Sequence, residues 1–380
     1  MSITVRVPVI KAAAPRRGAP VGFIKLSSDV SSFYGFKPIK AQSFAAAAAA
    51  LSAQHAAHPT EPALAYFASH SPAQLPLQTG LNLREVSEFT ISAVGAPGSV
   101  GEVILIKTAA NIAEEWGATV SRVRVNALGD KDSKLRFARE LASYLRRHAT
   151  ELNDECREML GRDPIAAFAC QTLVSREVVE AGPRPMNFLT EKSRAHFREV
   201  LEHLEKIGLP YELDDTLVGD EREPRVAFAL DLAEEDATIR LVQGGRFDDY
   251  LRRITNKKEG SAVSASLFFE KQGPARGAVA LPEIRRRAKI FFVQLGLPAK
   301  LMGLRVLEEL RRAGVPVLQT FNSSSLGPQL QAARDAKVTH LIIMGAREAL
   351  DGTVLVREMS NSSQEVMPVA HLARHLKNLK

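Results

Sequence analysis

The sequence predicts a two-domain α/β protein, on three observations. Its 380 residues are too many for one ordinary core, and 45% of them are apolar, enough to fill two interiors. The stretch 83–94 is typical of a strand covered on both faces, and 101–116 has the apolar spacing of a helix. Beyond residue 286, short strands alternate with helices, the pattern of a mainly parallel sheet. We therefore expect a domain boundary near residue 286.

The N-terminal domain is predicted to begin with a loose arm, rich in Ala, Pro and Arg, at 1–20. A Ser N-cap and strong helix formers predict a helix at 43–53, and the stretch that follows, to about Pro76, reads as a poorly packed connection. The strand predicted at 238–242 leads into Gly244–Gly245, which suits a tight turn that Arg246 with Asp248 is expected to hold in shape. The other elements are strands at 83–94, 120–125, 227–232 and 238–242, and helices at 101–116, 134–148, 152–160 and 191–207.

The C-terminal domain is predicted from short apolar runs that alternate with amphipathic stretches. Strands are expected at 290–295, 315–319, 340–344 and 353–358, and helices at 299–313, 326–336 and 369–379. Strands and helices of these lengths, taken in turn, indicate a small α/β domain.

Composition argues against several classes of protein. No apolar run is long enough to cross a membrane, and the N-terminus M-S-I-T-V-R-V-P-V-I-K lacks the features of a secretory signal, so we expect a cytoplasmic protein without a membrane partner. Cys156 and Cys170 are the only cysteines and have no metal-ligand spacing, so we expect two buried free thiols and no metal site. The P-loop, zinc-protease and nucleophile-elbow motifs are absent.

The net charge of +7 and the pI of about 9.4 favour polyanionic partners such as nucleic acid. Much of the basic excess lies between Arg285 and Lys289 and in the tail after His371. Such runs are more often solvated faces than binding sites, so both interpretations stay open.

Several motifs resemble one family. V-N-A-L-G-D at 125–130 is similar to its I-N-S-L-G-D, and G-G-R-F-D-D-Y-L at 244–251 to its G-G-R-Y-D-G-L. I-I-M-G-A-R-E-A-L-D-G-T-V-L-V-R-E-M at 342–359 looks like part of its anticodon-binding domain. On these residues the chain resembles the bacterial-type histidyl-tRNA synthetases, which are class II aminoacyl-tRNA synthetases, over roughly residues 84–380.

The resemblance implies a class II core at 1–285, with an antiparallel sheet and a helical insertion at about 126–212, and an anticodon-binding-like domain at 286–380. It also implies a homodimer, tRNA as a partner, and a need for ATP and Mg²⁺ in an active enzyme. The dimer-forming motif is represented by Y-G-F-K-P-I-K-A-Q at 34–42, in which Gln42 replaces the characteristic proline.

Two phosphate-binding motifs of the family are changed. The F-R-x-E segment should precede Leu83, where L-P-L-Q-T-G-L-N-L contains no arginine. In place of R-G-L-D-Y-Y stands G-D-E-R-E-P-R-V, so Gly219 takes the arginine position, with Arg222 and Arg225 nearby. The cations that would meet the developing charge on the α-phosphate of ATP are therefore not where the family has them.

The third motif and the histidine pocket are changed as well. G-L-E-R corresponds to F-F-E-K, in which Phe268 fills the place where glycine lets adenine approach and Lys271 cannot copy a planar guanidinium. H-Q-F-G-V-E-V-x-G aligns with S-E-F-T-I-S-A-V-G, and lost polar partners are costly for a polar ligand. In this alignment Glu88 stands for the glutamine, Ser92 for the carboxylate that would hold the amino group, and Phe247 for a tyrosine. The pocket remnant comprises Glu88, Ser92, Gly244, Gly245 and Phe247.

The leading hypothesis is a non-catalytic paralogue that keeps the fold, binds tRNA or another structured RNA, and needs no cofactor. Base contacts are assigned to Phe321 and Asn322, although core packing explains Phe321 equally well. Phosphate contacts are assigned to Arg285, Arg286, Arg287 and Lys289.

Two alternatives stay open. A divergent histidine-tRNA ligase would use Arg222, Arg225 or Arg246, with Lys271 as a further remnant, and would require ATP and Mg²⁺. A regulatory subunit or scaffold would bind a protein partner, as does the synthetase-like regulatory subunit of ATP phosphoribosyltransferase, which generally lacks the domain at 286–380.

Overall fold

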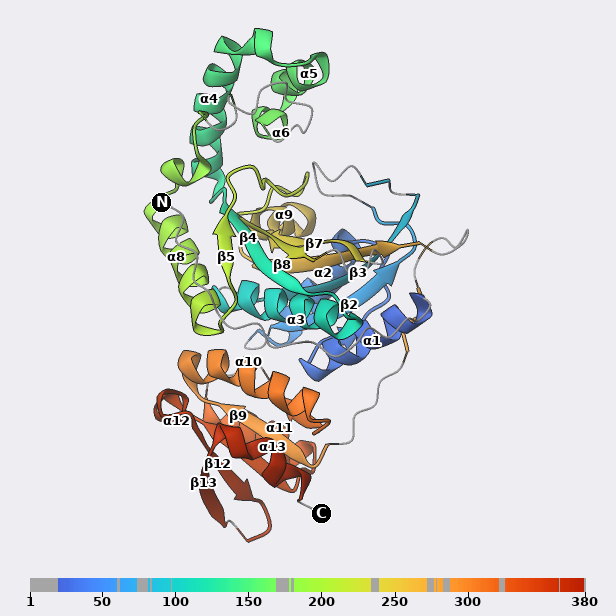
Figure 1. The fold of residues 1–380 in the computed structure, drawn as a ribbon, viewed down its shortest axis with the longest axis vertical. Helices are drawn as coiled ribbons and strands as arrows, with labels where there is room; N and C mark the ends of the chain where they lie inside the picture. Colours follow the sequence, from blue (N-terminus) through green and yellow to red (C-terminus); the bar gives the residue numbers. More distant parts are fainter. Residues whose placement is uncertain are drawn as a thin grey trace.

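The computed structural model describes residues 20–378 except 60–61, 74–80, 83, 97, 169–177, 179–180, 234–238, 272–276, 278, 283–287, 321–324 and 362. No helix in this part of the chain combines the length and the apolar composition that crossing a bilayer requires. The chain forms two sheets, one above the other along the long axis of the molecule (Figure 1).

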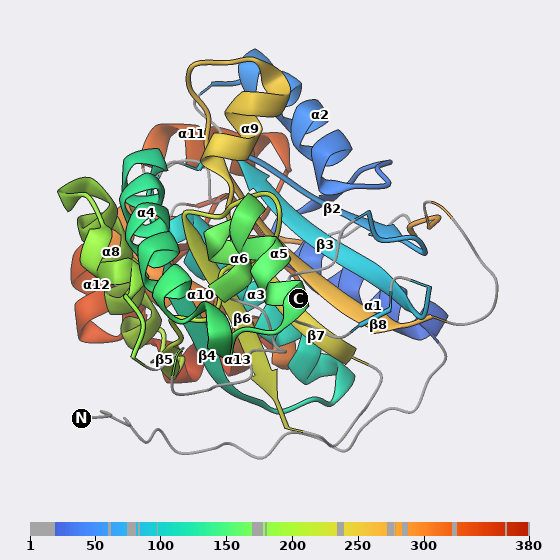
Figure 2. The same ribbon diagram turned by 90° about the horizontal axis from the view of Figure 1, so that it is seen from above.

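The larger sheet has eight strands in the order β1-β2-β3-β8-β7-β6-β4-β5. Only its outermost pairs, β1–β2 and β4–β5, are parallel; the other pairs are antiparallel. Figure 2 shows the central strands β3, β8, β7 and β6 from above, lying next to one another. The strands are β1 (Lys37–Pro38), β2 (Ala63–Ser69), β3 (Val86–Val94), β4 (Val120–Ala127), β5 (Tyr211–Leu213), β6 (Val226–Leu232), β7 (Ile239–Arg246) and β8 (Ala262–Glu270).

Helices cover both faces of this sheet because strand residues alternate between two apolar clusters. On one face, α1 (Pro20–Phe33) and α3 (Val100–Trp116) pack on Phe89, Ile91 and their neighbours. On the other face, α2 (Phe44–Ala57) and α9 (Asp248–Thr255) pack at the end of the strands near Val94.

The helical insertion extends away from the sheet at the top of Figure 1. Helices α4 (Lys131–Arg147), α5 (Asp154–Arg162) and α6 (Pro164–Phe168) enclose a separate apolar cluster. Helix α8 (Glu191–Lys206) leads back to the sheet and packs against α3. Asp130 caps α4 and Thr190 caps α8, each by accepting a backbone N–H.

Cys156 in α5 corrects one prediction. Its side chain is buried, as expected, but it is disulfide-bonded and not free. The number and spacing of cysteines along a chain do not give the distance between their sulfurs in the fold, and the prediction failed for this reason. Cys170 lies outside the described residues.

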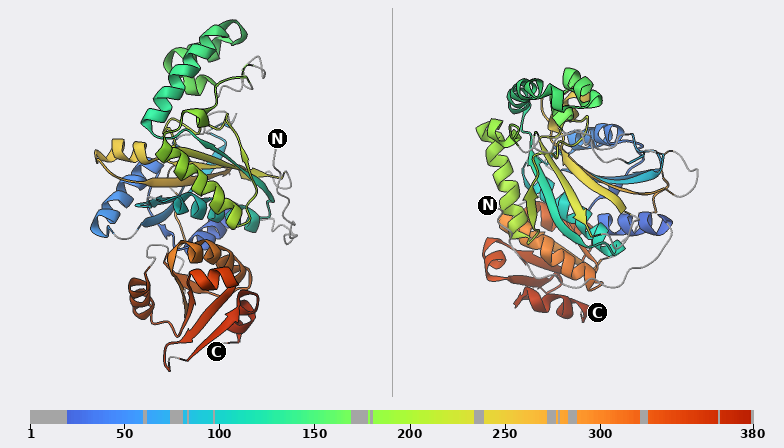
Figure 3. Two further views of the ribbon diagram at one scale, coloured as in Figure 1. Left: turned by 90° about the vertical axis from the view of Figure 1, so that its left-hand side faces the viewer. Right: turned by 45° about the horizontal axis from the view of Figure 1, so that its top comes forward.

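The smaller sheet has the order β10-β9-β11-β12-β13, with β10, β9 and β11 parallel and the last two pairs antiparallel. Helices α10 and α13 cover one face, and α11 covers the other (Figure 3). Strand β13 and helix α12 were not predicted. The elements are β9 (Ile290–Gln294), α10 (Gly296–Arg312), β10 (Val317–Gln319), α11 (Leu326–Asp335), β11 (His340–Met344), α12 (Ala346–Asp351), β12 (Thr353–Glu358), β13 (Gln364–Pro368) and α13 (Val369–Lys377).

Helices α3 and α10 join the two sheets. Lys107 Nζ lies 2.6 Å from Glu308 Oε2, with both side chains largely buried. Arg311 Nη1 lies 2.7 Å from the Glu115 carboxylate nearby. One apolar cluster continues from the larger sheet through these helices to the smaller sheet. The joint is therefore a shared core and not a flexible linker.

The prediction of an α/β fold with an antiparallel-rich core, a helical insertion and a smaller α/β domain is confirmed. The expected connection before Pro76 is wrong in part, because β2 occupies it as a strand with six of its seven residues buried.

Candidate functional site

Polar side chains line one face of the central strands of the larger sheet. Alternation along β3 places Glu88, Thr90 and Ser92 on the face opposite α3. The register places Ser266 of β8 opposite Thr90, Gln243 of β7 opposite Ser266, and Ser264 opposite Ser92. All are buried. We call this set the polar floor: Glu88, Thr90, Ser92, Gln243, Ser264 and Ser266.

Hydroxyl groups on the polar floor hydrogen-bond mainly to one another. Thr90 Oγ1 lies 2.8 Å from Ser266 Oγ, and Ser92 Oγ donates to Ser264 Oγ at 3.3 Å. Ser92, proposed as the remnant of an amino-group site, is thus engaged by the neighbouring strand. Its hydroxyl has no negative charge to offer an ammonium group.

Glu88 is the charged member of the polar floor. It is 6% exposed and forms no ion pair with any described residue. Burial raises the pKa of its carboxyl to about 7, against the opposing effects of Arg222 and of a hydrogen bond from Thr90. Near neutral pH the carboxyl is therefore protonated in a large fraction of molecules.

The double glycine corrects the predicted turn. Gly244 and Gly245 lie inside β7, paired with β6 and β8, and neither has a positive φ. A Cβ on Gly244 would overlap the carbonyl oxygen of Ser264, and one on Gly245 would come within 2.6 Å of the Val226 oxygen. Close approach of the chain's own strands, and not a turn, requires glycine here.

Arg222 is held at the edge of the polar floor by its own chain. Its Nε donates to Asp220 Oδ1 at 2.8 Å, and the guanidinium stacks over the rings of Phe247 and Phe44, 4.2 and 4.9 Å from their centroids. Phe247, the residue in the tyrosine position, is fully buried and serves as a platform for this arginine.

Arg246 points away from the polar floor, because it follows Gly245 on the strand. It is 2% exposed and donates two hydrogen bonds of 2.6 Å to Glu102 of α3, with a longer one to Asp248. Burial alone would raise the pKa of Glu102, but Arg246 and a hydrogen bond with His196 lower it to about 2. Arg246 therefore fastens β7 to α3, and the predicted contact with Asp248 is present.

Arg225 and Lys271 are also placed by local structure. Arg225 Nη1 lies 3.2 Å from Asp248 Oδ2, and its Nη2 lies 3.8 Å from Asp130. Lys271 follows β8, where its backbone N–H donates to Glu85 O at 2.8 Å. The four candidate cations thus do not form one cluster. Arg222 borders the polar floor, Arg225 and Arg246 share the Asp248 carboxylate beyond it, and Lys271 follows the end of β8.

Sequence reasoning missed two partners of these arginines, Asp220 and Glu102. Asp220 is two residues from Arg222 and could have been found as a local ion pair, whereas Glu102 is far from Arg246 in sequence and carried no signal. Thr90, Ser264 and Ser266 could have been found from the alternation of hydroxyl and apolar residues in the two strands.

Of the predicted RNA-binding residues, only Lys289 is described. It is exposed just before β9, and its carbonyl oxygen accepts N–H bonds from Thr339 and His340. Arg285, Arg286, Arg287, Phe321 and Asn322 lie outside the described residues.

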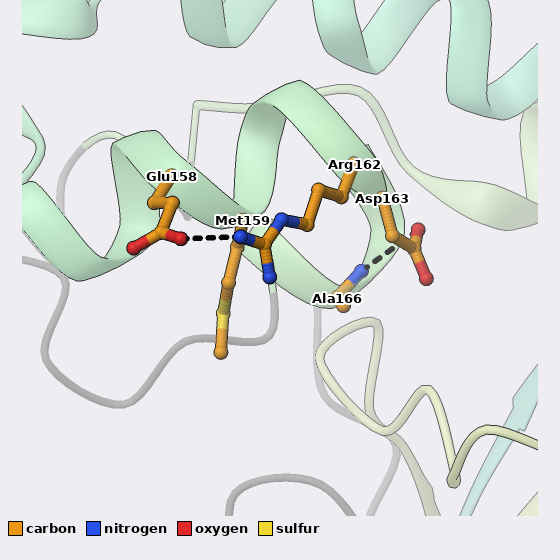
Figure 4. A pocket seen from close by; sticks show the side chains of 5 residues that line it. All are labelled: Glu158, Met159, Arg162, Asp163 and Ala166. Atoms are coloured by element: carbon orange, nitrogen blue, oxygen red, sulfur yellow. Dashed lines mark hydrogen bonds and ion pairs between the residues drawn. The ribbon is translucent and has the colours of Figure 1, made fainter.

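A separate small pocket of about 200 Å³ lies on the insertion (Figure 4). Glu158, Met159, Arg162, Asp163 and Ala166 line it, and Arg162 is paired with Glu158 one helical turn away. The Asp163 carboxylate accepts the N–H of Ala166 as a local cap. Arg162 and Glu158 thus bind each other, and Asp163 is engaged with the backbone at the start of α6.

Known proteins are similar to the chain over most of its length. A family model described as an anticodon binding domain matches residues 299–379. The histidine–tRNA ligase of Halothermothrix orenii is 25% identical over 303 residues, 78% of this chain and 71% of that protein. That of Rhodospirillum rubrum is 27% identical over 297 residues, 77% of this chain and 70% of that protein. The solved structure of apo S. aureus histidyl-tRNA synthetase is 18% identical, covering 97% of this chain and 100% of that one, with a TM-score of 0.49.

Proposed function

We propose that this chain, which belongs to the histidyl-tRNA synthetase family, binds RNA through its C-terminal domain and no longer forms an aminoacyl adenylate. The observation that carries the loss of adenylation is the pairing of three arginines near the old cleft with carboxylates of the same chain. Arg222 is paired with Asp220, Arg225 with Asp248, and Arg246 with Glu102.

Adenylation needs cations that can meet the charge developing on the α-phosphate of ATP. Diverting Arg246 to a phosphate would leave Glu102, which is fully buried, with His196 in place of its guanidinium partner, at a cost of several kcal/mol. The described residues therefore do not fit ATP and Mg²⁺, and we derive no catalytic step through them.

The polar floor supports the same proposal. Phe268 lies on this face beside Glu88, where its ring is 2% exposed and occupies space next to the pocket remnant. A free amino acid would find one carboxyl with a raised pKa and hydroxyls already engaged with one another. Polar ligand groups would be desolvated there without full compensation.

RNA binding is supported by the match of the C-terminal residues to an anticodon binding domain and by the basic balance of the chain. We further propose a cytoplasmic homodimer, because this is what the family resemblance implies. Sedimentation equilibrium at micromolar concentration should give twice the chain mass of 41.5 kDa, and a monomer would contradict this part of the proposal.

Equilibrium binding of unfractionated tRNA tests the proposed RNA function. We expect binding that weakens steeply with salt, with log K falling by about 0.7 to 0.9 per released phosphate counterion for each unit of log salt concentration. At moderate salt, tRNA should bind more tightly than a mixed-sequence single strand. Equal binding of the two polymers would overturn the proposal.

A regulatory role through a protein partner is the second candidate, because a core that no longer forms an adenylate can still serve as a scaffold for another protein. Purification of the native complex distinguishes the two functions. A stoichiometric protein partner together with weak, unselective RNA binding would favour regulation.

A further inference from the structure

Exposed basic side chains gather at one edge of the smaller sheet. Ligands of open α/β sheets usually bind at the carboxyl ends of the parallel strands. Here the cations lie at the opposite edge, where β9 and β11 begin. We call Lys289, Arg334 and Lys337 the amino-end ridge.

Backbone hydrogen bonds bring these residues together. The carbonyl oxygen of Lys289 accepts the N–H groups of Thr339 and His340 at 2.8 and 3.0 Å. The N–H of Lys337, two residues before Thr339, donates to Arg334 O at 2.9 Å. The start of β9 and the end of α11 are thus held side by side, independently of the side chains.

The side chains of the amino-end ridge are free for a partner. Lys289, Arg334 and Lys337 are all exposed, and none forms an ion pair with a residue that the structure describes. The neighbouring carboxylates of Asp335 and Glu358 already accept hydrogen bonds, the first from Gln331 and the second from Ser360 and Asn361.

Lys337 has a backbone conformation that its residue type disfavours. Its φ is +52°, in the left-handed region where an L side chain is strained. The corresponding position after α10 is Gly314, with a φ of +72°, and helices α3, α8 and α12 likewise end on glycine. Glycine would serve the turn after α11 better, so the lysine is present at a conformational cost. Strained residues of this kind concentrate at functional sites.

We propose that the amino-end ridge binds backbone phosphates of RNA. The inference rests on the proposed RNA function and specifies where the C-terminal domain contacts the phosphates. Three unpaired cations on a short, backbone-fixed edge match the repeated charge of a nucleic-acid strand, and such contacts position RNA without reading its sequence. A lysine at position 337 is also favoured by its attraction to the C-terminal end of the α11 helix dipole, which would stabilise the fold without any RNA. The test must therefore separate an effect on stability from an effect on RNA binding.

Lys337→Gly makes this separation. Glycine relieves the strain, so the thermal midpoint should stay unchanged or rise, while the affinity for unfractionated tRNA should fall about three- to tenfold at moderate salt. Replacing all three residues, with Lys289→Ala and Arg334→Ala added, should weaken binding about 100-fold and reduce the salt slope by about two. Fluorescence anisotropy over a salt series measures both quantities.

Arg347→Ala is the matched control. Arg347 is exposed on α12, which follows the carboxyl end of β11, so the same charge is removed from the opposite edge of the same domain. We expect less than a twofold change in affinity. A larger loss in Arg347→Ala than in Lys337→Gly would place the RNA at the carboxyl ends and overturn the ridge proposal.

Two other outcomes would also contradict the proposal that the amino-end ridge binds RNA. If the unaltered chain binds tRNA selectively and the triple variant binds it equally well, the amino-end ridge proposal is refuted. The proposed RNA function would then still stand. Failure of the unaltered chain to bind RNA selectively would refute the proposed function and the ridge together.

Discussion

Arg222, Arg225 and Arg246 each have a carboxylate partner. Arg246 is the most buried of them and pairs through two nitrogen atoms with the Glu102 carboxylate, both distances being 2.6 Å. A buried pair of this kind need not add much stability over an apolar pair, but removing one partner leaves an uncompensated charge. At the scale of single residues, each of these cations is engaged with a carboxylate of the same chain, as the proposed loss of adenylation requires.

Glu102→Gln tests this interpretation of Arg246. The guanidinium would remain 2% exposed without its main countercharge, so the free energy of unfolding should fall by about 3 to 5 kcal/mol. Urea denaturation measures the change. Glu212→Gln is the control, because Glu212 pairs with Arg122 at the surface and should contribute less than about 1 kcal/mol. Equal losses in the two variants would contradict the structural role of Glu102.

Glu88 gives a prediction about pH. Its carboxyl pKa is raised from 4.5 to about 7, so between these values the folded chain holds a proton that the unfolded chain has lost. The free energy of unfolding should therefore fall as the pH rises through this interval. Glu88→Gln removes the titration and should raise stability at pH 8 by up to about 3 kcal/mol. Urea melts at several pH values should show a flatter curve for the variant, and parallel curves would contradict the prediction.

The sequence predicted some of these residue contacts and not others. The link between Arg246 and Asp248 was predictable because the residues are neighbours on the chain. The pair with Glu102 was not, because only the packing of α3 under β7 brings the two together. The platform formed by Phe44 and Phe247 under Arg222 depends on the same kind of long-range contact.

The end of strand β7 differs from the end that the sequence predicts. The sequence predicts that it ends before the double glycine, because glycine pairs usually mark turns, yet the strand continues to Arg246. Both glycines are needed because strands β6 and β8 and the ring of Phe228 approach closely on either side. Local propensity gave the wrong end of the strand because tertiary packing decided it.

Gly244→Ala should therefore destabilise the chain by at least about 2 kcal/mol, because the added methyl group would overlap the Ser264 oxygen and the Phe228 ring. Gly327→Ala in α11 is the control, since no atom lies within 4 Å of its added Cβ, and it should be neutral or stabilise by up to about 1 kcal/mol. Thermal denaturation of both variants measures the difference. A neutral Gly244→Ala would show that β7 is not packed as described.

At the scale of the whole molecule, the sequence predicted the order and type of most elements because apolar periodicity is local. It placed a domain boundary near residue 286, and that boundary remains a prediction. Periodicity could not show that α3 and α10 share one apolar core. It also could not show that Lys107 forms a buried ion pair with Glu308. Lys107 and Glu308 lie on two helices that pack on different sheets.

This joint predicts cooperative unfolding of the two sheets. Calorimetry of the unaltered chain should show one transition. Glu308→Gln leaves Lys107, whose side chain is 7% exposed, without its partner and should lower the midpoint or split the transition in two. Glu365→Gln, at an exposed position on β13, should change neither. Two transitions in the unaltered chain would contradict the shared core.

We propose that the N-terminal part of the chain has lost adenylation while the C-terminal domain binds RNA. Amino-acid-dependent exchange of pyrophosphate into ATP tests this claim most directly, because it reports adenylate formation without any need for RNA. We predict no exchange above background with histidine or with any other standard amino acid at saturating ATP and Mg²⁺. Histidine-dependent exchange would contradict the account and show that the paired arginines can still be released to the phosphate.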